Sequence, residues 1–263
     1  MRAFGFYPNN KPQLDAILSK FLSRPANVID YAKGCIVPHA GYAFSGELAA
    51  TTLATARTHS KKIIILGTNH TGIDTFIDNG SWETPLGAAE LDFDLIEKIG
   101  IEQHPSDEHS IEVIVPILQK LYSDFSFVPL VVGQADYEEL EMIAKDLAEL
   151  AKNENIFFTA SSDFIHYGPN YGFNKFGTGR PAVDAVVKKD NELIELIKKM
   201  EPNKFYETVN KENLTVCGFR PITLLLMIMK KLKANNTTLI DHKTSFDVHP
   251  DKSFVDYIGM VFN

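Results

Sequence analysis

The stretch KKIIILGTNHTG, residues 61–72, decides the fold. The four apolar residues Ile63 to Leu66 indicate a strand buried on both faces, and a polar, glycine-bounded segment with His70 follows at once. Three other segments repeat this arrangement, in which an apolar run ends in residues that bind metals or move protons. They are CIVPHAGYAFSG (35–46) with His39, NIFFTASSDFIHYG (155–168) with Asp163 and His166, and LTVCGFRPITLLL (214–226) with Cys217.

Strand and helix signals alternate along the chain. Short β-branched runs predict strands at 36–37, 63–66, 127–132, 156–159, 237–240 and 254–262. Apolar residues at three- and four-residue spacing predict helices at about 12–23, 46–58, 106–122, 137–152, 181–200 and 217–233, with a kink at Pro116. Helices between strands predict an α/β fold with a mixed, largely parallel central sheet and helices on both faces. The last two strands lack an intervening helix, so we expect them to form an antiparallel pair.

Length and composition limit the classes of protein and partner. A chain of 263 residues with 44% apolar content can form one core, so we expect a single domain over residues 1–263. The net charge is −8 and no basic cluster is present, which argues against a nucleic-acid partner. The sequence has neither a signal-peptide pattern nor an apolar run of about 18 residues, so we expect a cytoplasmic protein without a membrane segment.

Residues at several strand ends can converge, because ligand crevices in open α/β sheets lie beyond the carboxyl ends of the strands. We therefore expect His39, His70 and Cys217 to form a metal site. Cys217 lies at the start of a predicted helix, whose positive end favours the thiolate. Taken singly, each histidine could also cap a strand or bond to a loop carbonyl.

Asp163 and His166 lie three residues apart. If the chain turns helically there, both face one way, and the carboxylate could set the imidazole tautomer or His166 could act as general acid/base. An ordinary helix cap at Ser161-Ser162-Asp163 explains the segment equally well.

The remaining candidates are weaker. Cys35 lies within an apolar strand, which indicates a buried, inert thiol. His109 could join the crevice or lie at a solvated helix start. We expect the other histidines to lie on the surface: His59, His104, His242 and His249.

Six motifs carry a resemblance to a known family. VPHAGYAFSG, LGTNHTG, WETPLG, EHSIEVIVPIL, SSDFIHYG and CGFRPITLLL occur in the order in which they occur in the Memo family, called AmmeMemoRadiSam system protein B in prokaryotes. The resemblance covers about residues 2 to 262. It implies a fold like that of the class III (LigB-type) extradiol dioxygenases, which are non-haem iron enzymes.

The resemblance also implies roles for the candidate residues. His39, His70 and Cys217 fall on metal-ligand positions, while Asp163 and His166 line the pocket, with His166 as the acid/base. Cys217 replaces the carboxylate ligand of the dioxygenases, which puts ring cleavage in doubt and softens the site towards Cu(I), Zn(II) or a differently tuned iron. Of these metals, the resemblance favours iron or copper and gives zinc little support. We expect a metal-dependent oxidoreductase acting on oxygen or a small-molecule substrate. The alternative is a metal-binding or peptide/protein-interaction protein with a vestigial dioxygenase-like pocket and no catalysis.

Overall fold

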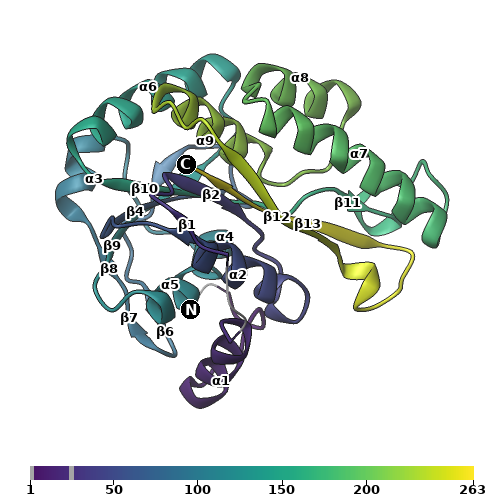
Figure 1. Cartoon of the computed structure of the whole chain (residues 1–263), viewed down its shortest axis with the longest axis horizontal. Coiled ribbons are helices and arrows are strands. Elements are labelled where there is room, and N and C mark those ends of the chain that lie inside the picture. The colour runs from purple at the N-terminus through teal and green to yellow at the C-terminus, as the bar shows by residue number, and fades with distance from the viewer. Residues whose placement is uncertain (1–2, 24–26) are drawn as a thin grey trace.

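The computed structural model describes residues 3–23 and 27–263. A nine-stranded sheet forms its centre, with the strand order β11-β13-β2-β10-β4-β9-β5, β12 paired with β13, and β8 paired with β9 (Figure 1). The strands are β2 (Gly34–Val37), β4 (Lys62–Thr68), β5 (Phe76–Ile77), β8 (Glu90–Leu91), β9 (Ser126–Val132), β10 (Ile156–Ser161), β11 (His166–Tyr167), β12 (Thr237–Thr244) and β13 (Phe254–Phe262). Two small sheets pair β1 (Ile29–Asp30) with β3 (Ala56–Arg57) and β6 (Glu83–Thr84) with β7 (Gly87–Ala88).

Strand directions confirm the predicted fold class. β10 is parallel to both β2 and β4, and β4 is parallel to β9. β13 is antiparallel to β2 and to β12, so the predicted antiparallel pair is also confirmed. Because β2, β4 and β10 are parallel, their carboxyl ends lie along one edge of the sheet.

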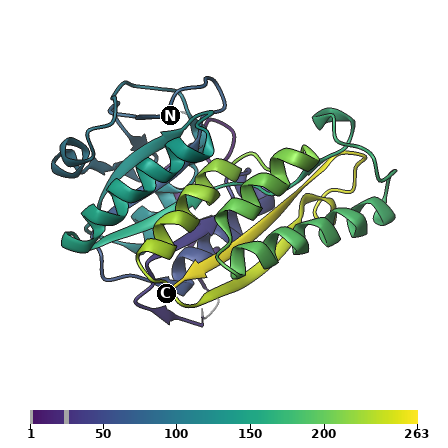
Figure 2. The same cartoon turned by 90° about the horizontal axis from the view of Figure 1, so that it is seen from above.

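Helices cover both faces of the sheet (Figures 1 and 2). One face carries α1 (Lys11–Phe21), α2 (Glu47–Thr55), α4 (His109–Glu112) and α5 (Val115–Leu121). The other carries α3 (Phe93–Ile99), α6 (Tyr137–Asn153), α7 (Arg180–Lys198), α8 (Pro202–Glu212) and α9 (Phe219–Lys231). Of these, α3 and α8 lie outside the helices predicted from the sequence.

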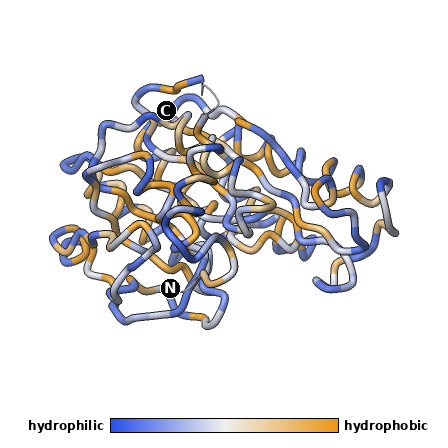
Figure 3. The backbone as a smooth tube through the Cα atoms, turned by 90° about the horizontal axis from the view of Figure 1, so that it is seen from below, coloured by the Kyte–Doolittle hydropathy of each residue, from blue (hydrophilic) through white to orange (hydrophobic). Residues whose placement is uncertain are grey.

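The continuous apolar run of β4 is explained by this two-sided cover. Ile63 and Ile65 belong to the core beneath α1, α2 and α5, while Ile64 and Leu66 belong to the core beneath α6 and α9. Neighbouring side chains of a strand point to opposite faces, so each face of β4 is buried. Figure 3 shows the apolar chain gathered inside the body and the polar chain along its outer loops.

Local sequence sets the helix ends. Asp136 and Glu139 form a capping box at the start of α6, which then buries Leu140, Ala144 and Leu147 on one face. The predicted helix over 106–122 is divided into α4 and α5. Pro116 lies in the first turn of α5, where a backbone N–H would have no partner within the helix, so its absence costs no hydrogen bond.

A close approach between a helix and the sheet positions part of the site. A Cβ atom at Gly67 would lie 2.4 Å from Cγ1 of Ile111, so only glycine lets α4 pack directly on β4. This contact fixes the start of α4 beside the end of β4. Over the described ranges, every helix is too short or too polar to cross a membrane.

Candidate metal centre

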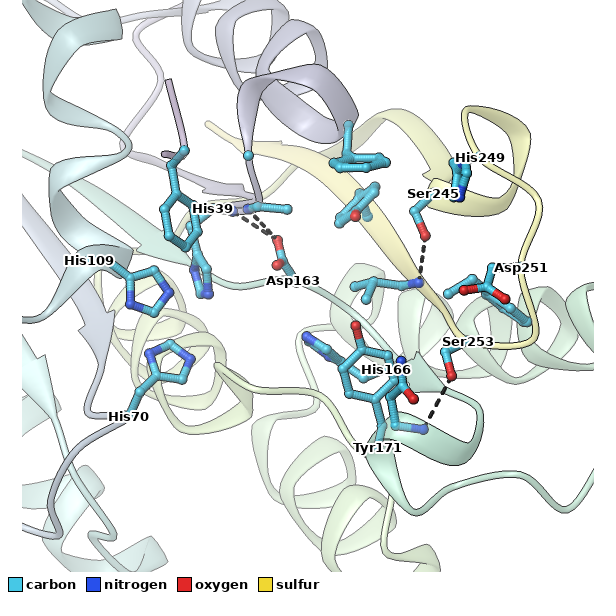
Figure 4. Close-up of a pocket in the computed structure, with 18 residues that line it drawn as sticks. His39, His70, His109, Asp163, His166, Tyr171, Ser245, His249, Asp251 and Ser253 are labelled. Carbon is cyan, nitrogen blue, oxygen red and sulfur yellow. Dashed lines mark hydrogen bonds between the residues drawn. The ribbon is translucent and has the colours of Figure 1, made fainter. Parts of the chain in front are cut away.

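The edge where β2, β4 and β10 end holds a cluster of chemically active side chains. His39 and His70 each follow their strand by two residues, and Asp163 follows β10 by two. These side chains line a cavity of about 500 Å³. Figure 4 shows His39, His70 and His109 gathered on one side of the cavity and His166 on the other. Aromatic side chains complete much of the wall: Phe6, Phe44, Tyr171 and Tyr257.

His39 is held with one ring nitrogen available for a ligand. It is buried, and Nδ1 lies 3.0 Å from the Ser161 hydroxyl oxygen. That hydroxyl donates its own proton to the Ser110 carbonyl at 2.6 Å, so it can only accept from Nδ1–H. Nε2 therefore keeps its lone pair. Burial, followed by the charges of His70 and His109, holds the pKa of His39 well below its usual value, which favours the neutral imidazole that metals require.

His70 is oriented by a buried carboxylate. Glu108 is 1% exposed and accepts both the His70 backbone N–H and Nδ1–H, each at 2.9 Å. It also accepts the Ser110 backbone N–H at 2.8 Å and so caps α4. Burial raises the pKa of Glu108, but the hydrogen bonds and charge of His70 outweigh it and bring the value to about 2. The ionised carboxylate fixes the His70 tautomer and leaves Nε2 free, as in carboxylate–histidine–metal arrangements.

His109 joins the same group. Its ring stacks on His70 with centroids 4.7 Å apart, and its Nδ1 lies 3.4 Å from Glu108. One ring nitrogen from each of His39, His70 and His109 can be chosen so that all three lie within 4.8 Å of one another. The structure thus places His109 in the crevice, one of the two positions that the sequence leaves open.

Cys217 belongs to a second group that shares His39. Its Sγ lies 3.4 Å from His39 Nε2, and Cys217, His39 and Asp163 offer atoms within 4.8 Å of one another. Among the described residues, His70 and Cys217 are not members of a common group. Cys217 does precede α9, with Gly218 between them.

Two effects oppose the predicted bias of Cys217 towards the thiolate when no cation is bound. Burial, and then the charge of Asp163, raise the pKa of Cys217 well above its usual value. These effects act against the positive end of α9, because the partly exposed thiol is desolvated and lies beside a carboxylate. A bound cation is what would deprotonate it.

Asp163 and His166 both line the cavity, but the helical geometry considered for them is wrong. The backbone at His166 is extended and pairs with β13 as part of β11. Asp163 accepts the backbone N–H groups of His39 and Ala40 at 2.9 and 3.1 Å, so it positions the loop after β2 and does not set the His166 tautomer. The Phe164 and Thr215 carbonyls, each 3.0 Å from Nδ1 of His166, perform that role and leave Nε2 free.

The sequence placed Cys35 in the interior and four further histidines on the surface, and the structure agrees with some of these predictions and contradicts one. Cys35 is fully buried beside Thr159, and burial raises the pKa of its thiol to about 12, as expected of an inert cysteine. His59 is exposed, and His249 lies at the rim of the cavity. His104 stacks on Phe76 with centroids 3.6 Å apart. His242 is not a surface residue: its side chain is 13% exposed and lies beside two buried aspartates.

Sequence reasoning missed Glu108 and Ser161 as the groups that orient the two histidines. Glu108 has a weak signal, since an acidic residue directly before a helix is also an ordinary cap. Ser161 has none, because its role depends on the pairing of β2 with β10.

A protein-family model and individual relatives point to the same family. The family model described as "Memo-like protein" matches residues 2–261. A MEMO1 family protein of Thermoplasma volcanium is 35% identical over 259 residues, which cover 94% of this chain and 90% of that protein. A MEMO1 family protein of Archaeoglobus fulgidus is 32% identical over 272 residues, with coverage of 99% and 97%.

A solved structure supports the fold. The uncharacterized protein JW3007 from Escherichia coli K12 superposes with a TM-score of 0.56 at 12% identity, covering 88% of this chain and 99% of that chain. At this identity the likeness concerns the fold alone.

Proposed function

The chain belongs to the Memo-like protein family, and from this premise we propose that it binds a redox-active transition metal, iron or copper, through Nε2 of His39 and of His70. One observation carries the proposal. Both histidines commit Nδ1 to buried acceptors, Ser161 Oγ and the Glu108 carboxylate, so both present an unprotonated Nε2 at the same wall of the cavity. In protein metal sites, a histidine ligand usually donates its other ring N–H to a nearby hydrogen-bond acceptor in the same way.

Cys217 is our choice for the third ligand. Its sulfur already lies 3.4 Å from the same Nε2 of His39, and thiolate ligation favours copper or a differently tuned iron over the hard cations. His109 is the competing donor, because its ring lies within 4.8 Å of the other two histidine ligand atoms. A site with three imidazoles also suits zinc, so the choice between sulfur and nitrogen bears on the metal.

We propose that the site serves an oxidoreductase acting on oxygen or a small molecule. The metal would supply electron transfer and polarisation of a bound group. His166 would hold or deliver a proton at Nε2, since its Nδ1–H is fixed by two carbonyls and its ring faces the histidine cluster across the cavity (Figure 4). Asp163 would keep the loop that carries His39 in place. A cytoplasmic location would keep both cysteines reduced.

A binding protein without catalysis is the second candidate. The cavity extends well beyond the histidines to Asn170, Ser245 and Ser253, which offer hydrogen-bonding groups along an aromatic wall. Such a surface could hold a peptide or protein segment. In that case the metal would shape the pocket and no turnover would follow.

Anaerobic purification followed by elemental analysis and an oxygen-consumption assay tests the proposal. We expect iron or copper to be retained and oxygen to be consumed under reducing conditions. Cys217→Ser and His109→Asn identify the third ligand, because the variant that lacks a ligand loses metal while the other keeps it. Metal retention in a His39→Ala, His70→Ala double variant at wild-type level would overturn the proposed site. Metal retention without oxygen consumption would favour the binding protein.

A further inference from the structure

Three side chains outside the cavity form a separate buried cluster. Asp190 of α7 and Asp256 of β13 are both fully buried, and His242 of β12 lies between them. Nε2 of His242 is 3.0 Å from Oδ2 of Asp190 and 3.6 Å from Oδ2 of Asp256. One ligand atom from each residue lies within 4.8 Å of the others.

Three carboxylate oxygens of this cluster have no hydrogen-bond donor among the described residues. They are Oδ1 of Asp190 and both Oδ atoms of Asp256. Burying an ionised oxygen without a donor is costly, and a single imidazolium cannot serve four oxygens. Two carboxylates with one protonated imidazole also retain a net charge of about −1 in a region without solvent. The cluster therefore needs either a proton held between the two aspartates or a further cation.

The three ligand atoms lie close enough together to surround one small cation. Ligand atoms 2.0–2.2 Å from a tetrahedral centre lie about 3.3–3.6 Å from one another. The separation of 3.6 Å lies within this range, whereas that of 3.0 Å is shorter and matches the hydrogen bond between His242 and Asp190. Two carboxylates and one neutral imidazole balance a doubly charged ion, and the unpartnered oxygens would become its ligands. Carboxylate oxygen with imidazole nitrogen suits Zn²⁺ or Mn²⁺ and does not favour the softer Cu(I).

We propose that Asp190, His242 and Asp256 bind a divalent first-row transition-metal ion at a structural site distinct from the cavity. The ion links α7 to the β12–β13 pair, which lie side by side in Figure 2. Asp256 points away from the cavity, since its neighbours Val255 and Tyr257 are the residues that line it. The site therefore braces one wall of the cavity from behind and does not contact the cavity's contents.

The experiment uses the full chain with His39→Ala and His70→Ala, so that the cavity histidines do not compete. A calorimetric titration of this protein with Zn²⁺ should show one binding site, the proposed structural site. Adding Asp256→Asn should weaken binding by more than about 100-fold, beyond the loss typical of outer-shell partners. Asp241→Asn is the matched control, because Asp241 lies beside His242 on β12 and is exposed, so it should leave binding unchanged.

Cobalt substitution keeps the test decisive if Asp256→Asn folds poorly. Co²⁺ at this site should give d–d absorption without thiolate charge transfer, and His242→Gln should abolish the absorption while Cys217→Ser leaves it unchanged. The thermal midpoint of the background protein should rise with Zn²⁺. Absence of Zn²⁺ binding and of the cobalt spectrum in the folded background protein would overturn the site and show that the cluster is neutralised by protons alone.

Discussion

Glu108 gives the sharpest test of how the candidate metal centre is organised. Its carboxylate accepts three N–H groups, two from His70 and one from Ser110, and is almost completely buried. Glu108→Gln keeps the shape and removes the charge. The amide nitrogen must replace one of the two accepting oxygens, so at least one of the three N–H groups meets a donor in place of an acceptor.

The expected loss follows from these contacts. If the amide oxygen faces Nδ1 of His70, a charge-assisted hydrogen bond becomes a neutral one, a change of about 1–1.5 kcal/mol. If the amide nitrogen faces it, the His70 tautomer reverses and Nε2 becomes protonated. We therefore expect metal affinity to fall roughly 10–100-fold. That range corresponds to about 1.4–2.8 kcal/mol.

Chelator competition at neutral pH measures the affinity, and ¹⁵N spectra of the imidazoles report the His70 tautomer. Asp107→Asn is the matched control, because it removes the same charge from an exposed neighbouring position. Affinity within twofold of the wild type in a folded Glu108→Gln protein would refute the reasoning, as would an equal loss in Asp107→Asn.

Four further outcomes are expected. Cys217→Ser should lower metal content sharply, whereas Cys35→Ser should act through packing alone, which elemental analysis and thermal unfolding distinguish. His166→Ala should retain metal and lose roughly 10²–10⁴-fold in turnover if the protein is an enzyme, as measured by steady-state kinetics. Hydrogen bonds from two lysines lower the pKa of Glu154 to about 2, so its stabilising effect is present above about pH 4.5 and disappears as the pH falls towards 2. Glu154→Gln should therefore flatten that part of an acid-denaturation curve, and the difference from the wild type should be smaller in high salt. Gly67→Ala should destabilise the fold by about 1–3 kcal/mol in urea denaturation, since its Cβ would meet Ile111.

Long apolar or periodic segments made most of the fold predictable. The β4 run and the 3.6-residue pattern of α6 give strong signals because each reflects a buried face. The short helix α3 and the polar helix α8 escaped prediction because their burial depends on neighbours supplied by other parts of the chain.

The site was predictable only to the level of strand ends. Histidines that follow a strand, such as His39, indicate a crevice. Which ring nitrogen each histidine presents to a ligand depends on hydrogen bonds to residues distant in the sequence. The free thiol of Cys217 shows the limit clearly, since the helix start was visible in the sequence and the burial that opposes it was not. His242 likewise looked solvated because its aspartate partners lie 52 and 14 residues away, on α7 and β13.

The contact between Cys217 and His39 joins residues 178 positions apart in the chain. A nascent chain cannot make this contact until residue 217 has left the ribosome, when β2, β4, β9 and β10 have all been synthesised and can pair. Partial translation products therefore carry the histidines without the sulfur. If Cys217 is the third ligand, as we propose, the metal site is completed only after these four strands have been synthesised.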